Sequence, residues 1–314
     1  MSNKTIAKFF AFVISTAFIL IFFSGCSNVS SNIDRKESPS RYDAPTVNGK
    51  IKSPDIIESS GVAASRCQNN VLWTHNDSDD GPFIFALNFS GEVLGTWKVV
   101  NSENVDWEDI AAYKDKGGAC FIYIGDIGDN EEKLAEHVVY RVREPVVVPA
   151  DKNSSRQKPL LTEPAGAVRF SYPDSKPNAE TLLVNPINAD VYVITKRLNG
   201  PAGVYRLRPS SEGAAKLEKV TDLSVPSIPN GYLTGGDISP DGHRMIICDY
   251  TQAYEYTLPD NATSFDDIWH QTPEIVNIGE RKQGEGIAYS ADGTSLFATS
   301  EGKNSPLIEV KLRK

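Results

Sequence analysis

The sequence predicts an all-β protein, a β-propeller of five four-stranded blades, and three observations support this prediction. A segment that begins with polar or acidic residues and continues into apolar ones occurs five times. A turn and a short apolar run follow each copy. The last copy is followed by one strand fewer than the others, and a segment that can supply this outer strand precedes the first copy. The chain has 314 residues, and all-β domains of such length are common as single units.

The five copies share one pattern, in which an apolar residue follows the polar start. They are S-S-G-V-A-A-S from Ser59, D-W-E-D-I-A-A from Asp106, N-A-E-T-L-L-V from Asn178, T-G-G-D-I-S-P-D-G from Thr234 and Q-G-E-G-I-A-Y-S-A-D-G from Gln283. Their apolar residues are Val62, Ile110, Leu182, Ile238 and Ile287, about fifty residues apart except for one longer interval. A fixed period of this kind indicates a repeat architecture.

Each copy is followed by the elements of one blade. First comes a turn, such as K-D-K-G-G or S-P-D-G, whose residues preset a tight turn or tolerate positive φ. Next comes a run of four apolar residues, such as F-I-Y-I or M-I-I-C, which is the length of a strand rather than of a buried helix. Third and fourth strands follow, several of them alternating apolar and polar residues, as half-buried outer strands do.

The two ends of the chain are expected to complete one blade together. The sequence stops after the third strand of the last copy, L-I-E-V-K-L, and T-V-N-G-K-I-K at residues 46–52 supplies the missing strand. The longer interval contains P-V-V-V-P-A-D-K-N-S-S-R-Q-K-P, which we interpret as a loop inserted in blade two. A sixth blade would need another copy of the segment. A two-sheet sandwich would not explain the fixed order of segment, turn and strand.

The N-terminal residues predict export and lipid attachment. Residues 1–25 combine Lys4 and Lys8 with a short apolar run, as export signals do, although an uncleaved membrane anchor is the alternative. F-S-G-C resembles a lipobox, with Phe23 in place of the usual Leu, and implies a lipidated Cys26, carrying palmitate or similar chains. Residues 26–45 read as a flexible tether, and residues 46–314 as the propeller. We therefore expect a protein held on a bacterial membrane, the outer one if the host has two and otherwise the only one.

Charge and cysteines restrict the partners. The formal net charge is -9, which disfavours nucleic acid and favours a cation or a basic ligand. No C-x-x-C motif occurs, so a zinc ribbon is not expected. Cys67 and Cys120 fall in similar turns and could pair in the oxidising compartment, while three unpaired thiols including Cys248 are the alternative.

The acidic starts of the repeated segments are expected to converge. In a propeller, the loop into each first strand and the loop after each second strand open on one face. The five positions of the first kind are Ser60, Glu108, Glu180, Gly236 and Glu285, and Asp109 and Asp237 lie one residue further along their strands. The second set of loops contributes candidate binding residues: Asp77, Asp126, Asp129, Lys196, Arg197, Asp249 and Glu301. The charge would then gather at a channel mouth.

Three interpretations of this acidic ring stay open. The carboxylates could be structural, capping turns or fixing the backbone of the next blade. They could bind a hard cation, because oxygen ligands without His or Cys clusters suit calcium or magnesium. They could also be catalytic, with Glu108 and His75 as candidates; His75 is the histidine expected on this face, although a structural histidine is the alternative.

The repeats resemble those of known exported propellers. E-D-I, G-E-G-I-A-Y-S-A-D-G and S-P-D-G are similar to segments of the SdiA-regulated propeller family and of the esterase-like-phytase propellers. W-T-H-N-D-S, D-W-E-D-I-A and G-D-I-G-D-N are similar to a group of such propellers without an assigned activity. The resemblance covers about residues 50–314 and implies a calcium-associated site at Glu108, Glu180 and Glu285. Ser60 and Gly236 depart from the acidic pattern.

Two functional hypotheses follow. The first is a lipid-tethered binding module, a monomer that holds a protein, glycan or small molecule with calcium as the candidate cofactor. The second is a metal-dependent hydrolase of the phosphoesterase or lactonase kind, with Lys196 and Arg197 binding an anionic substrate. The absence of G-x-S-x-G, H-E-x-x-H and P-loop motifs favours the first. Fold by itself does not decide between them.

Overall fold

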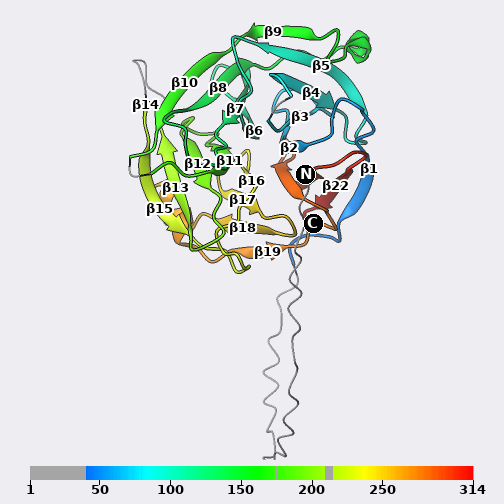
Figure 1. Cartoon of the computed structure of the whole chain (residues 1–314). Helices are drawn as coiled ribbons and strands as arrows, with labels where there is room; N and C mark the ends of the chain where they lie inside the picture. The colour runs from blue at the N-terminus through cyan, green and yellow to red at the C-terminus, as the bar shows by residue number, and fades with distance from the viewer. Residues whose placement is uncertain (1–39, 79, 174, 209–214, 314) are drawn as a thin grey trace, which may run out of the picture. The chain divides into compact units, whose positions relative to one another are not determined.

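The computed structural model describes residues 40–78, 80–173, 175–208 and 215–313. These residues form five sheets arranged in a ring, which confirms the predicted propeller of five blades (Figure 1). The export signal, Cys26 and the tether up to residue 39 lie outside the described residues. Within the described part of the chain, no helix is long and apolar enough to cross a bilayer.

Each blade begins with its innermost strand and proceeds outward. Blade one has β2 (Ser59–Ala64), β3 (Leu72–Asn76), β4 (Phe83–Leu87) and β5 (Val93–Val100). Blade two has β6 (Trp107–Lys114), β7 (Cys120–Asp126), β8 (His137–Arg143) and β10 (Gly166–Ser171). Blade three has β11 (Ala179–Val184), β12 (Val191–Thr195), β13 (Ala202–Leu207) and β15 (Glu218–Leu223).

Blade four has β16 (Gly235–Ile238), β17 (Arg244–Cys248), β18 (Ala253–Thr257) and β19 (Glu274–Val276), and the 3-10 helix η2 (Phe265–His270) lies between its last two strands. Blade five has β20 (Gly284–Tyr289), β21 (Ser295–Ser300), β22 (Pro306–Lys311) and the N-terminal β1 (Thr46–Lys50). β1 pairs antiparallel with β22, so the predicted closure of the ring by both ends of the chain is confirmed.

The hydrophobic core is divided among the five seams between blades. Each of the five buried clusters draws its side chains from two neighbouring blades, for example Trp73 of blade one with Trp107 of blade two. Alternate residues of a strand point to opposite faces of its sheet, so a blade can pack against both of its neighbours. This is why the repeated apolar runs are buried along their whole length, as in β12 and β21.

The insertion differs from the predicted loop of blade two. After the 3-10 helix η1 (Pro149–Asn153), β9 (Leu160–Pro164) pairs parallel with β5 and adds a fifth strand to blade one. An outer strand leaves one row of backbone groups unpaired, and a neighbouring segment can satisfy them. The short β14 (Ala215–Lys216) adds to β10 of blade two in the same way.

Residues 40–45, predicted as the end of the tether, belong to the compact unit Ser40–Lys314. Tyr42 is buried, forms a bridge with Leu312 and donates a hydrogen bond to Glu255 of β18. Arg41 also pairs with Glu255 and with Glu274. The propeller therefore begins a few residues earlier than the composition indicated.

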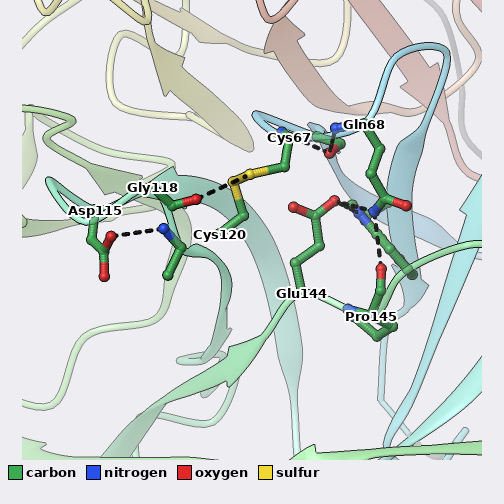
Figure 2. The surroundings of a disulfide bond; sticks show 10 residues. Cys67, Gln68, Asp115, Gly118, Cys120, Glu144 and Pro145 are labelled. Carbon is green, nitrogen blue, oxygen red and sulfur yellow. Dashed lines mark hydrogen bonds between the residues drawn. A yellow bond between two sulfur atoms is a disulfide. The ribbon is translucent and has the colours of Figure 1, made fainter.

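A disulfide joins blades one and two. Cys67, in the turn after β2, is bonded to Cys120, the first residue of β7, with their Cα atoms 6.2 Å apart (Figure 2). Cys248 is free and buried in blade four. Glu108 lies near the beginning of β6, on the side where β2 also begins. Cys67 follows the end of β2, and Cys120 follows the end of β6, so the disulfide lies at the opposite ends of these strands.

Candidate functional site

The candidate site lies where the five innermost strands begin, and we call this end of the ring the mouth. The strands β2, β6, β11, β16 and β20 contact one another in this order around the axis. Their first residues, and the loops that leave the second strands, contribute the side chains discussed below. The repeated segments therefore converge on one face, as the sequence indicated.

A β-bulge marks the start of four inner strands. The pairing register shifts across Ser60 in β2, Glu108 in β6, Glu180 in β11 and Glu285 in β20. A bulge leaves a residue unpaired and changes the direction of its side chain, and bulges are frequent beside functional sites. β16 pairs without such a shift and carries Gly236 at the corresponding position.

Three carboxylates from blades one and two lie close together at the mouth, and we call Asp77, Asp106 and Glu108 the acidic cluster. Asp77 follows β3, whereas Asp106 and Glu108 lie at the start of β6. One oxygen from each of the three lies within 4.8 Å of the others. Burial raises the pKa of Glu108 well above its usual value, and the charges of Glu180, Asp77 and Asp106 raise it further. Burial and the neighbouring Asp77 raise the pKa of Asp106 to about 7.

The backbone of Gly128 lies against the acidic cluster. A Cβ atom at this position would come within 3.0 Å of Glu108 Oε1 and of Asp106 Oδ2. The N–H of Gly128 donates to the carbonyl oxygen of Asp106 at 3.1 Å, which fixes the loop in this place. A side chain at this position would occupy the space beside the two carboxylates, which would have to shift.

Two further acids lie on the blade-five side of the mouth. Glu285 is 4% exposed, and its Oε2 has no hydrogen-bond partner among the described residues. Burial raises the pKa of Glu285 well above its usual value, and the charges of Glu301 and Glu180 add to this. Burial also raises the pKa of Glu301. Ionisation of these two carboxyl groups is therefore unfavourable, as it is in the acidic cluster.

Lys196 supplies positive charge on the blade-three side. Its ammonium forms an ion pair with Glu180, and it lies 4.5 Å from the ring centre of Tyr232 and 5.0 Å from that of Tyr250. Burial works to lower the pKa of Lys196, but the charge of Glu180 outweighs it, so the lysine stays protonated. Its Nζ is 3.3 Å from Tyr250 Oη, which is 3.3 Å from Tyr232 Oη. Two aromatic faces thus hold the ammonium group in place.

The predicted ligands Glu108, Glu180 and Glu285 do not form one close group. Only Glu108 belongs to the acidic cluster, because Lys196 holds Glu180 and Glu285 lies with Glu301. The sequence analysis missed Asp106, Tyr232 and Tyr250. Asp106 stands two residues before Glu108 in D-W-E-D, and three of the other four segments have no acidic residue at the same position.

Asp109 and Asp237, predicted as binding residues, hold the inner strands together. Asp109 accepts hydrogen bonds from the N–H groups of Ile110 (2.8 Å), Leu182 (3.0 Å) and Gly236 (3.2 Å), and so links blades two, three and four. Asp237 accepts from the N–H of Tyr289 at 2.9 Å and pairs with Arg66. These carboxylates face the backbone of neighbouring blades, and their contacts indicate a structural role instead of the predicted ligand binding.

Three other predicted binding residues shape loops. Asp126 accepts from the N–H of Asp106 at 2.7 Å, and Asp129 accepts from the N–H of Leu134 at 2.7 Å. Asp249 accepts from the N–H of Thr251 and of Gln252 and from the hydroxyl of Tyr254. Short acidic side chains stabilise turns in this way. Their carboxylates position the loops of the mouth.

Arg197 is exposed and does not accompany Lys196. Its side chain lines a shallow outer groove of about 230 Å³ together with Tyr205 and Asp222 of blade three. Successive residues along an extended chain point in opposite directions, so only one of the two can face the mouth. The predicted pair of cations is therefore a single lysine.

His75 lies inside the wall of blade one and not on the open face. It is fully buried, its Nδ1 is 2.9 Å from the carbonyl oxygen of Asn76, and its ring contacts Trp107 edge to face. Burial lowers the pKa of His75 to about 4, so the ring is neutral at pH 7. Its position removes it from the groups that could touch a ligand at the mouth.

Comparisons with known proteins concern the fold alone. No protein-family model matches the sequence, and no curated protein is significantly similar to it. One solved structure with a similar fold is XC5397 from Xanthomonas campestris, described as a gluconolactonase important in glucose secondary metabolic pathways. The two chains are 12% identical, 86% of this chain and 89% of that chain are covered, and the TM-score is 0.46.

Proposed function

We propose that this protein is a binding module that holds a divalent hard cation, with calcium as the candidate, in the acidic cluster at the propeller mouth. Through the cation it binds an oxygen-rich ligand or partner. The observation that carries the proposal is the approach of Asp77, Asp106 and Glu108 to within 4.8 Å of one another. Calcium takes six to eight oxygen ligands, and three carboxylates with water molecules supply that number.

The electrostatics of the mouth support a cation. Within residues 40–78, 80–173, 175–208 and 215–313, no Lys or Arg forms an ion pair with Asp106 or Glu108, and Lys196 is already paired with Glu180. Buried like charges disfavour one another's ionisation, and a divalent cation offsets that cost. On the blade-five side, Glu285 Oε2 is buried and has no hydrogen-bond partner among the described residues, so a further carboxyl oxygen there is left without a donor.

Thermal unfolding tests the proposal. The protein is stripped with a chelator and then titrated with calcium, magnesium and zinc. A cation at a thousand times its Kd stabilises the folded state by about 4 kcal/mol. We expect calcium to raise the melting temperature, Glu108→Gln with Asp106→Asn to remove the rise, and the exposed control Glu163→Gln to retain it. A flat calcium titration of the unmodified protein contradicts the proposal.

A second candidate function, metal-dependent hydrolysis of a phosphoester or lactone, is favoured by Lys196 and the tyrosine hydroxyls. They place hydrogen-bond donors on the blade-three side of the mouth, where an anionic oxygen of a substrate could bind. Chromogenic phosphate and ester substrates with and without calcium test this function. Turnover that requires calcium and is lost in Lys196→Met supports the hydrolase. Absence of turnover contradicts the hydrolase and favours the binding module.

The same proposal includes the membrane attachment expected from F-S-G-C. We propose that Cys26 carries acyl chains and tethers the propeller to the membrane. Metabolic labelling with a palmitate analogue tests it: incorporation into the unmodified protein and none into Cys26→Ser is expected. Equal labelling of both proteins contradicts lipidation at this cysteine.

A further inference from the structure

A second group of potential metal ligands lies at the disulfide, at the end of the inner strands remote from the mouth. The sulfur atoms of Cys67 and Cys120 and a carboxylate oxygen of Glu144 all lie within 4.8 Å of one another (Figure 2). Cys67 is exposed in the turn after β2, whereas Cys120 and Glu144 are 5% and 6% exposed. Glu144 directly follows β8, so three separate segments of blades one and two meet here.

The carboxylate of Glu144 is held firmly on one side and left without a partner on the other. Its Oε1 accepts hydrogen bonds from Trp73 Nε1 and from Gln68 Nε2, each at 2.9 Å. Its Oε2 is buried and has no hydrogen-bond partner among the described residues. Figure 2 shows the unbonded oxygen on the side of the disulfide. A buried carboxylate oxygen without a partner is costly, so the protein retains this arrangement against a free-energy penalty.

We propose that reduction of the disulfide converts this group into a zinc site with the Cys67 and Cys120 thiolates and Glu144 Oε2 as ligands. A dithiol reductant supplies two electrons and two protons and itself becomes a disulfide. Zinc then binds both sulfurs as thiolates and displaces their two protons. Two sulfur ligands and one carboxylate, with water in the fourth position, suit zinc, whereas calcium prefers oxygen alone.

The local structure allows this change. The two sulfur atoms must move apart to bind one ion, and Cys67 can provide the movement because its side chain is exposed in a turn. Cys120 and Glu144 stay in place, the first by its position in β7 and the second through Trp73 and Gln68. A metal would also link the turn of blade one to β7 of blade two, as the disulfide does. Blades one and two would thus be tied together in both redox states.

Cobalt provides the test, because cobalt bound to thiolates absorbs strongly in the near ultraviolet and carboxylate-bound cobalt does not. The full-length protein is reduced with a dithiol, desalted without oxygen and titrated with cobalt. We expect the charge-transfer band to saturate at one equivalent, to disappear when zinc is added, and to be absent from the oxidised protein. Glu108→Gln is expected to leave the band unchanged, which separates this site from the mouth.

Two variants test the ligands. Cys67→Ser is expected to abolish the band. Glu144→Gln keeps an acceptor oxygen for Trp73 and Gln68 but removes the anionic ligand, and we expect cobalt affinity to fall at least about tenfold. The exposed control Glu163→Gln is expected to bind as the unmodified protein does. Equal affinity in Glu144→Gln and the unmodified protein overturns the proposed site.

Circular dichroism shows whether reduction unfolds the protein. If the reduced protein stays folded and shows no thiolate band with cobalt, the proposal is overturned. If the reduced protein unfolds and regains its fold when zinc is added, the proposal is supported, because the metal then replaces the covalent link. If it stays unfolded in the presence of zinc, the proposal is overturned.

Discussion

Glu108 and Asp109 are neighbours in the chain, both buried and both acidic, yet their side chains have different surroundings. Asp109 has three backbone N–H donors, from its own blade and from two others. Glu108 faces Asp77 and Asp106 and has no ion-pair partner within the residues that the structure describes. Burial raises the pKa of both carboxyl groups. Burial is therefore common to both, and the hydrogen-bond donors around Asp109 distinguish it, as a structural carboxylate, from the candidate ligand Glu108.

The largest effect is expected at Asp109. Asp109→Ala would leave the N–H groups of Leu182 and Gly236 buried without an acceptor, at about 1–3 kcal/mol each. We expect the free energy of unfolding to fall by roughly 3 kcal/mol or more. Urea unfolding in the presence of chelator measures it. A loss below about 1 kcal/mol would show that these contacts do not hold the inner strands together.

The opposite sign is expected at Glu108. In the presence of chelator, Glu108→Gln removes one of the repelling charges and should raise the free energy of unfolding by about 1 kcal/mol. With saturating calcium, the same substitution should make the protein less stable than the unmodified one, because a ligand is lost. Paired urea titrations with chelator and with calcium measure both. Destabilisation in both conditions would place Glu108 with the structural carboxylates.

The pH dependence sharpens the same contrast. The folded pKa of Asp106 is about 7, above its usual value of 3.8, so the folded state binds this proton more tightly than the unfolded state. Without metal, this carboxyl group should therefore lower stability as the pH rises from about 4 to about 7. Calcium is expected to remove that decline. Comparing Asp106→Asn with the unmodified protein over this range isolates the contribution.

The smallest effect on stability is expected at Gly128. Gly128→Ala keeps every charge but places a methyl group beside Glu108 and Asp106. The metal-free protein should lose about 1 kcal/mol, because the atoms that must shift are the ends of the Glu108 and Asp106 side chains. The calcium-dependent rise in melting temperature should nevertheless disappear, because the methyl group occupies the space for the ion. A retained rise would place the cation elsewhere in the mouth.

Much of the fold follows from the repeated segment. Five copies in a fixed order with turns predicted five blades, and T-V-N-G-K-I-K at residues 46–52 predicted the closure that β1 makes with β22. The insertion was misjudged because its partner is the edge of β5, which belongs to another blade. Local sequence indicates that a segment is extended but does not specify which edge it joins, because edge pairing depends on what lies nearby in the folded protein.

The candidate site divides in the same way. The sequence by itself determined that acidic residues gather at the starts of the inner strands, because the repeat fixes which residue begins each strand. Only the tertiary structure decided which of them meet donors and which meet one another. Asp109 reaches the backbone of two other blades, Lys196 neutralises Glu180, and Asp77 comes from a different blade to join Glu108. These contacts join residues far apart in the chain, and their energies depend on distances that exist only once the ring has closed.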